Sequence, residues 1–347
     1  MSQALLSVIF LAAVFLCGSA SAQAQGAGLY FDAKLSSPAV KLDHLFDDWN
    51  ATSKGEYAYG QLKVGTWFQL NEYLTLGIEQ RKYHFLDFTY ETALFYGQLE
   101  NQNIPIGDYP LNLSVNSSNS NAVFVRYFMP VNEAFTASVA AYLLKGSYGQ
   151  IGELSGLGSV SESGDGSEIY TYEYSLNYLY DRNELFEHNA PGSSGYGHSF
   201  DLFLEYQVTE NISVNLSVED LFHRMYWNPI NRDSGCFSRL ATIGQSCLLN
   251  TSLMRFNQSL PESKALSVSY AVNQYNLSVL ALDQSYHKER WFAAGWNIYG
   301  VAYDQYNESY KLTYESDHLT VKWSFDDYDL NNANNWQVTL AANWPFE

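Results

Sequence analysis

Long apolar runs are scarce in this chain of 347 residues. The longest, residues 5–16, is too short to cross a bilayer as a helix, and small residues follow it up to Ala22. This pattern predicts a signal peptide over residues 1–22, cleaved after Ala22. No later stretch approaches about 18 consecutive apolar residues, so the sequence predicts no transmembrane helix.

Basic residues are also scarce. The chain has 18 Lys and Arg against 37 Asp and Glu, which gives a net charge of -19. A strongly negative protein repels the phosphate backbone of nucleic acids, so we expect no nucleic-acid partner. The excess of acid indicates a solvated acidic surface, an interior that attracts cations, or loops bridged to lipopolysaccharide by divalent ions.

Cysteine is the third scarce residue, with 3 in the whole chain. Cys17 belongs to the predicted signal peptide, which leaves Cys236 and Cys247 in the mature protein. An isolated pair in an exported protein usually forms a disulfide, which here would close one loop. No cluster of His and Cys accompanies the pair, and we expect no metal site and no cofactor.

Aromatic residues, by contrast, are abundant: 28 Tyr, 20 Phe and 8 Trp. Apolar and polar residues alternate with a period of two over residues 200–208, 212–219, 266–279, 310–325 and 336–346. Such strands, with aromatic girdles, predict an all-β fold: a transmembrane antiparallel up-and-down β-barrel of about 14 strands, with 12 to 16 possible. A soluble β-sandwich also alternates, but its strands are usually shorter than these.

The predicted barrel occupies residues 57–347, and residues 23–56 form a first strand or a plug. Long polar connections are expected outside the cell, and tight turns on the periplasmic side. The long connections fall at residues 99–120, 147–167, 181–197 and 223–263. A single strand at 168–180 breaks the up-and-down order between two of them.

The C-terminal strand resembles the assembly signal of bacterial outer-membrane barrels, which is an amphipathic strand that ends in an aromatic residue. Glu347 departs from this signal because it follows the aromatic. The resemblance implies a location in the outer membrane and, as partners, the barrel-assembly machinery, outer-membrane lipid and lipopolysaccharide. The matching residues are Trp336, Val338, Leu340, Trp344 and Phe346.

Residues 198–346 are similar in rhythm to the long-chain fatty-acid transporter group and to the conjugal-transfer TraF-type barrels. The shared features are short hairpins and an Asn-rich loop, here residues 329–335, before the last strand. The transporter group carries Asn-Pro-Ala in an N-terminal plug, where this chain has Ser37, Pro38 and Ala39. The resemblance covers less than half of the chain and transfers no functional residues.

Charged residues within the predicted strands are expected to face the lumen. They suggest a channel or transporter for small solutes with a cation-favouring lumen. The alternative is a non-conducting barrel that acts as an assembly or surface-interaction scaffold and binds a protein partner through loop 223–263. The candidate constriction residues are Arg81, Lys82, Arg126, Lys145, Glu79, Glu173 and Glu205.

Two clusters resemble parts of an active site. Asp326, Asp327 and Asp329 lie near one predicted strand end, and Asp283 and His287 near another, where acids and a His could activate water. Acids at strand ends are common in so acidic a chain, and His198 and Ser199 lack the spacing of a lipase pair. We expect no catalytic residues and no enzyme.

Overall fold

The computed structural model describes residues 25–46, 55–101, 105–162, 164, 168–181, 193–239, 249–284 and 287–346. Strands dominate these residues, and their pairings are antiparallel. The elements are β1 (Gly26–Ser36), η1 (His44–Phe46), β2 (Tyr57–Gln69), β3 (Leu74–Phe88), α2 (Tyr90–Asn101), β4 (Gly107–Asn132), β5 (Phe135–Glu162), β6 (Glu168–Tyr180), β7 (Gly195–Thr209), β8 (Ile212–Arg239), β9 (Leu249–Gln258), β10 (Ser263–Val272), β11 (Tyr275–Gln284), β12 (His287–Trp296), β13 (Tyr299–Asp304), β14 (Ser309–Glu315), β15 (Leu319–Phe325) and β16 (Asn335–Pro345).

Sixteen strands form one sheet, and fourteen of them close into a ring. The ring runs from β10 to β16, joins β1, continues to β5, passes to β7 and β8, and returns to β10. Outside the ring, β6 pairs with the later residues of β5 and β8, and β9 pairs with β8. The predicted barrel of about 14 strands is confirmed. Of the two alternatives for residues 23–56, a first strand or a plug, the pairing of β1 with β16 and β2 corresponds to a first strand, at Gly26–Ser36.

Side chains alternate between the two faces of the barrel wall. On β4, Val123 and Val125 are exposed on the outward face, whereas Ala122 and Phe124 are buried inside. Inward positions also carry charged side chains such as Arg81, which is buried. An apolar outward band around a polar interior is the pattern of outer-membrane barrels, since lipid solvates only the outer face. The chain is a membrane-spanning barrel of this type.

β16 carries the residues of the predicted assembly signal. Its partners on β1 place Gln337 and Thr339 on the inward face, where both lie beside Asp32. Trp336, Val338, Leu340 and Trp344 therefore point outward, as an amphipathic final strand requires. Recognition of this strand by the assembly machinery remains a prediction.

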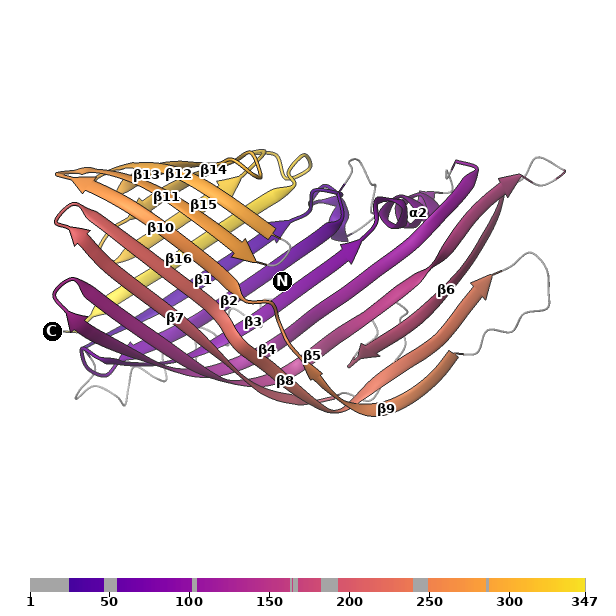
Figure 1. Cartoon of the computed structure of the whole chain (residues 1–347), viewed down its shortest axis with the longest axis horizontal. Helices are drawn as coiled ribbons and strands as arrows, with labels where there is room; N and C mark the ends of the chain where they lie inside the picture. The colour runs from indigo at the N-terminus through magenta and orange to yellow at the C-terminus, as the bar shows by residue number, and fades with distance from the viewer. Residues whose placement is uncertain are drawn as a thin grey trace.

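The two ends of the barrel differ, as Figure 1 shows. At one end, turns of two to four residues join the strands, and the C-terminus lies there. At the other end, β4, β5, β6, β8 and β9 continue far beyond the remaining strands, and α2 lies beside them (Figure 1). Short turns are periplasmic in this class, so the long end is extracellular.

The predicted long loops are corrected by the structure. Most of residues 107–120, 147–162 and 223–239 form the outer parts of β4, β5 and β8, and residues 249–258 form β9. The single strand at 168–180 is confirmed as β6, which pairs with these outer parts and so leaves the ring intact. The prediction was wrong because these segments are rich in Asn, Ser and Gly, as loops are, although their backbones continue the strand pairing of the wall. The helix α2 was also missed.

Among the described residues, no helix is long and apolar enough to cross a bilayer.

Candidate functional site: an apolar pocket above interior ionic networks

Arg81 lies at the centre of an ionic network inside the barrel. Its guanidinium binds Glu79 on the same strand, lies 2.6 Å from the Asp220 carboxylate, and is 3.8 Å from that of Asp201. It also stacks on the ring of Tyr142, with its central carbon 3.9 Å from the ring centroid. All of these groups are buried or nearly so. A buried cation is tolerated because several acids surround it.

Backbone geometry on β8 brings two consecutive acids into this network. Asp220 has a φ of 57°, and the pairing of β7 with β8 shifts register beside it. Glu219 and Asp220 can therefore both face inward, although neighbours on a regular strand point to opposite faces. Lys63 binds Glu219 at 2.6 Å, and Ser199 donates a hydrogen bond to Asp220 at 3.0 Å. These contacts join β2 and β3 to β8 across the interior.

A second cluster connects β1 and β2 to β12 across the interior. Lys34 on β1 binds Glu289 on β12, and His287 lies 2.8 Å from the same carboxylate. The Trp291 indole donates to Glu289 at 2.6 Å, and the hydroxyl of Tyr57 lies 3.2 Å from His287. This places His287 in an interior hydrogen-bond network rather than at a rim site.

An apolar layer accompanies the central network. Phe124, Tyr142, Met225 and Trp227 are buried in one cluster inside the wall. Trp227 lies against three glycines, and a Cβ at Gly149 would come within 2.5 Å of its ring. This cluster and the two ionic clusters project from the wall into the interior of the barrel.

The structure separates the predicted constriction residues. Glu79 and Arg81 meet inside the barrel, as predicted. Arg126 and Glu205 occupy inward positions near the periplasmic end, away from that pair. Glu173 lies on β6, outside the ring.

Lys82 and Lys145 lie on the outward face, so their assignment to the lumen is corrected. Lys82 follows the inward-facing Arg81 on a regular strand, and Lys145 follows the buried Leu144. The alternation already visible in the sequence excluded a common face for Arg81 and Lys82. Sequence reasoning missed inward charges whose partners lie on distant strands: Asp32, Lys34, Lys63, Asp201, Glu219, Asp220 and Glu289.

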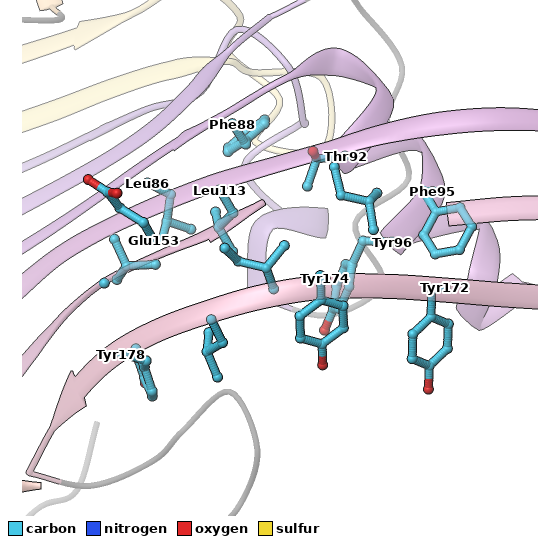
Figure 2. Close-up of a pocket in the computed structure, with 15 residues that line it drawn as sticks. Leu86, Phe88, Thr92, Phe95, Tyr96, Leu113, Glu153, Tyr172, Tyr174 and Tyr178 are labelled. Carbon is cyan, nitrogen blue, oxygen red and sulfur yellow. The ribbon is translucent and has the colours of Figure 1, made fainter. Parts of the chain in front are cut away.

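An apolar pocket of the extracellular end has a volume of about 310 Å³ and lies beneath α2 (Figure 2). On β4 its residues are Leu111, Leu113 and Val115, which continue the outward face of Val123. Figure 2 shows Tyr172 and Tyr174 on β6 and Phe95 on α2 around the same space. The other apolar and aromatic residues of the lining are Leu86, Phe88, Tyr96, Leu154, Leu176 and Tyr178.

Glycines on β5 make room for the aromatic rings of the pocket. A Cβ at Gly158 would lie 2.6 Å from the Phe95 ring, and one at Gly152 would lie 2.9 Å from the ring of Tyr178. The helix is anchored through Thr92, whose hydroxyl accepts a hydrogen bond from the Asn112 amide at 2.7 Å. The sequence signal for this site was the set of three glycines, Gly152, Gly156 and Gly158, that share one face of β5 with Leu154.

A second cavity of about 490 Å³ lies on the other face of the same strands. Its lining is more polar and includes Asn116, Asn177 and Ser259. The two cavities share Val115, Gly152 and Glu153. They are therefore back to back across β4 and β5, one on the outward face and one on the inward face.

The residues considered for catalysis have structural contacts. Asp326 accepts backbone N–H bonds from Asn334 and Asn335, which shape the turn before β16. Asp327 accepts the amide of Asp329 in the same turn. Ser199 donates to Asp220 inside the barrel, whereas its neighbour His198 packs beside Tyr226.

Of the predicted disulfide pair, Cys236 lies on β8, and Cys247 falls outside the described residues. The disulfide stays a prediction. The signal peptide also lies outside the described residues and stays a prediction.

No family model matches the chain, and a search of curated proteins finds no match. Among solved structures it is similar to TodX, a toluene transporter of Pseudomonas putida, at 10% identity over 93% of this chain and 90% of that one, with a TM-score of 0.43. A FadL homologue of Pseudomonas aeruginosa is 11% identical over 93% and 90% of the chains, with a TM-score of 0.39. The outer-membrane protease OmpT of Escherichia coli is 9% identical over 93% and 95%, with a TM-score of 0.28. Their activities belong to those proteins, and the architecture of this chain is defined by its own strand pairing.

Proposed function

We propose that this barrel is an outer-membrane channel for small hydrophobic solutes, which it captures in the pocket beneath α2. The observation that carries the proposal is the apolar and aromatic lining of that pocket at the extracellular end. Its volume of about 310 Å³ lies at the lower end of the range for ligand pockets, which begins near 300 Å³. A small apolar solute leaves water there without leaving polar groups unpaired.

The cavity on the inward face supplies a second resting place for the solute. The paired strands β4 and β5 separate it from the capture pocket at Val115, Gly152 and Glu153, and it lies on the inner face of the wall. Below it, the apolar layer around Trp227 and the network around Arg81 project into the interior and narrow the path of the solute. Passage through this level requires those side chains to move, which makes the barrel a gated channel.

A cation-favouring lumen is not part of the proposal. That expectation rested on the excess of acid over base in the whole chain, whereas inside the wall Glu79, Glu219 and Asp220 bind Arg81 or Lys63. We expect little steady ion conductance. The alternative of a scaffold that binds a partner at residues 223–263 does not account for either cavity, and most of its proposed loop consists of strands.

Binding of naphthalene to the full barrel in lipid nanodiscs tests the capture pocket, with the fluorescence of naphthalene as the readout. Leu154→Trp fills the pocket and should weaken binding at least tenfold. Leu143→Trp makes the same change on the lipid-facing wall, where Leu143 is 73% exposed, and should leave binding unchanged. The proposal fails if wild-type barrel shows no saturable binding, or if both variants behave alike.

Uptake of radiolabelled naphthalene by cells that produce the barrel tests passage separately. A channel predicts faster uptake with wild-type and Leu143→Trp barrels than with Leu154→Trp. Saturable binding without faster uptake would identify a binding scaffold instead.

A further inference from the structure

Three basic residues point outward from the tall wall, by which we mean the side of the barrel whose strands continue beyond the rest at the extracellular end. Lys82 lies on β3, Lys145 on β5 and Arg224 on β8, and each sits between residues that face inward. Their flanking residues, all buried, are Arg81 and Tyr83, Leu144 and Gly146, and His223 and Met225.

The strand register places these residues in one belt. Lys82 and Lys145 are separated by β4, whose outward residues at this level are asparagines. Lys145 lies opposite Tyr196 on β7, which in turn lies opposite Tyr226 on β8. Tyr196 and Tyr226 are 62% and 46% exposed. The belt thus combines bases with exposed tyrosines across β3, β4, β5, β7 and β8.

The height of the belt matches the outer edge of the membrane. Between the periplasmic turn and Lys145, the outward residues of β5 are Ala137, Val139, Ala141 and Leu143. From Phe135 to Lys145 the strand rises about 33 Å along its length, or roughly 24 Å of height at a tilt of about 45°. The apolar band of outer-membrane barrels is about 25 Å tall. Lys145 therefore stands where the hydrocarbon ends and the headgroups of the outer leaflet begin.

The three bases form no ion pair with a carboxylate in the described part of the chain. The contrast is Lys264 on β10, which also faces outward but binds Glu262 at 3.0 Å. In a protein with a net charge of -19, three neighbouring bases on one membrane-facing belt leave a local positive charge.

We infer that Lys82, Lys145 and Arg224 bind the phosphate groups of the glycolipid in the outer leaflet. Bases beside a membrane surface attract anionic headgroups, and an Arg guanidinium can bind phosphate with two hydrogen bonds. Tyr196 and Tyr226 add the amphipathic rings that favour the headgroup level. The bound glycolipid covers the tall wall just below the capture pocket.

Native mass spectrometry of the detergent-purified barrel, with lipid A as the probe, tests this inference. Replacement of all three bases, by Lys82→Gln, Lys145→Gln and Arg224→Gln, should weaken lipid A binding on the order of a hundredfold, since each base contributes about fivefold. Removal of one phosphate from lipid A should weaken binding to the wild-type barrel but change little for the triple variant.

Lys264→Gln is the matched control, and its binding should equal that of the wild type. Heat-dependent mobility on gels verifies that each variant is a folded barrel. Millimolar inorganic phosphate should not displace lipid A, and displacement would overturn the inference in favour of a general anion site. Equal losses in Lys264→Gln and the triple variant, or no loss in either, would also overturn it.

Discussion

The barrel has a tall wall and a short wall, which differ in strand length and in what lies above the membrane. In the tall wall, β4, β5 and β8 have 26, 28 and 28 residues, whereas β13, β14 and β15 in the short wall have 6, 7 and 7. At about 3.3 Å per residue, the longest strands extend about 90 Å and the short ones about 23 Å or less. Near the periplasmic turns both walls follow the same apolar-out pattern, so the membrane imposes one rule on both.

Above the membrane only the tall wall continues, and it carries the features linked to binding. These are α2, the two cavities, the outer strands β6 and β9, and the basic belt. The short wall instead displays cross-strand tyrosine pairs, such as Tyr299 with Tyr314, whose rings lie 5.6 Å apart. The short wall has a cavity of about 680 Å³ on its lipid-facing side, whereas the extracellular features proposed to bind ligands lie on the tall wall.

The largest expected difference between the walls concerns ion pairs. Arg81→Met removes a buried cation that serves Glu79 and Asp220, and should destabilise the barrel by about 3–5 kcal/mol, because it leaves buried carboxylates unpaired. Lys322→Met breaks an exposed pair with Glu315 on the short wall and should cost less than about 1 kcal/mol. Urea unfolding of the barrel in lipid vesicles measures both. Equal effects would mean that the interior network is hydrated and open.

A smaller difference between the two walls is expected in the destabilisation caused by replacing a glycine with alanine. A Cβ at Gly156 would lie 2.1 Å from the backbone oxygen of Glu173, so Gly156→Ala should push β6 away at a local cost of about 1–3 kcal/mol. Gly295→Ala on β12, where the nearest atom lies at 3.3 Å, should be milder. Hydrogen exchange should be faster in β6 for Gly156→Ala, while the exchange rates of the fourteen strands of the ring should be unchanged in both variants. Faster exchange throughout the ring would contradict a separable outer sheet.

The sequence predicted the parts of the molecule that touch lipid. Alternation at residues 336–346 reflects a strand with lipid on one face and polar groups on the other. This pattern can be recognised from the sequence of a single strand. The barrel class, its strand number and the position of β6 followed from it. The same alternation would have placed Lys82 outside, had it been applied to neighbouring charges.

The candidate site could not be predicted in the same way, for two physical reasons. On the outer part of β4, Leu111, Leu113 and Val115 do alternate with polar residues, but the elements that cover them, α2 and β6, cannot be assigned from this short segment. Interior partners such as Lys63 and Glu219 are 156 residues apart in the chain. Their meeting depends on ring closure and on the local irregularity at Asp220, neither of which a single strand encodes.

Cysteine labelling of intact cells tests most directly whether the tall wall stands outside the cell. Leu157 on the outer part of β5 is 46% exposed, and Val131 near the periplasmic turn is 58% exposed. A membrane-impermeant maleimide should label Leu157→Cys on intact cells and Val131→Cys only after the outer membrane is permeabilised. The parent chain, with Cys236 and Cys247 in the predicted disulfide, should stay unlabelled without reductant. Labelling of Val131→Cys but not Leu157→Cys on intact cells would contradict the assignment of the tall wall, its pocket and its basic belt to the outer side.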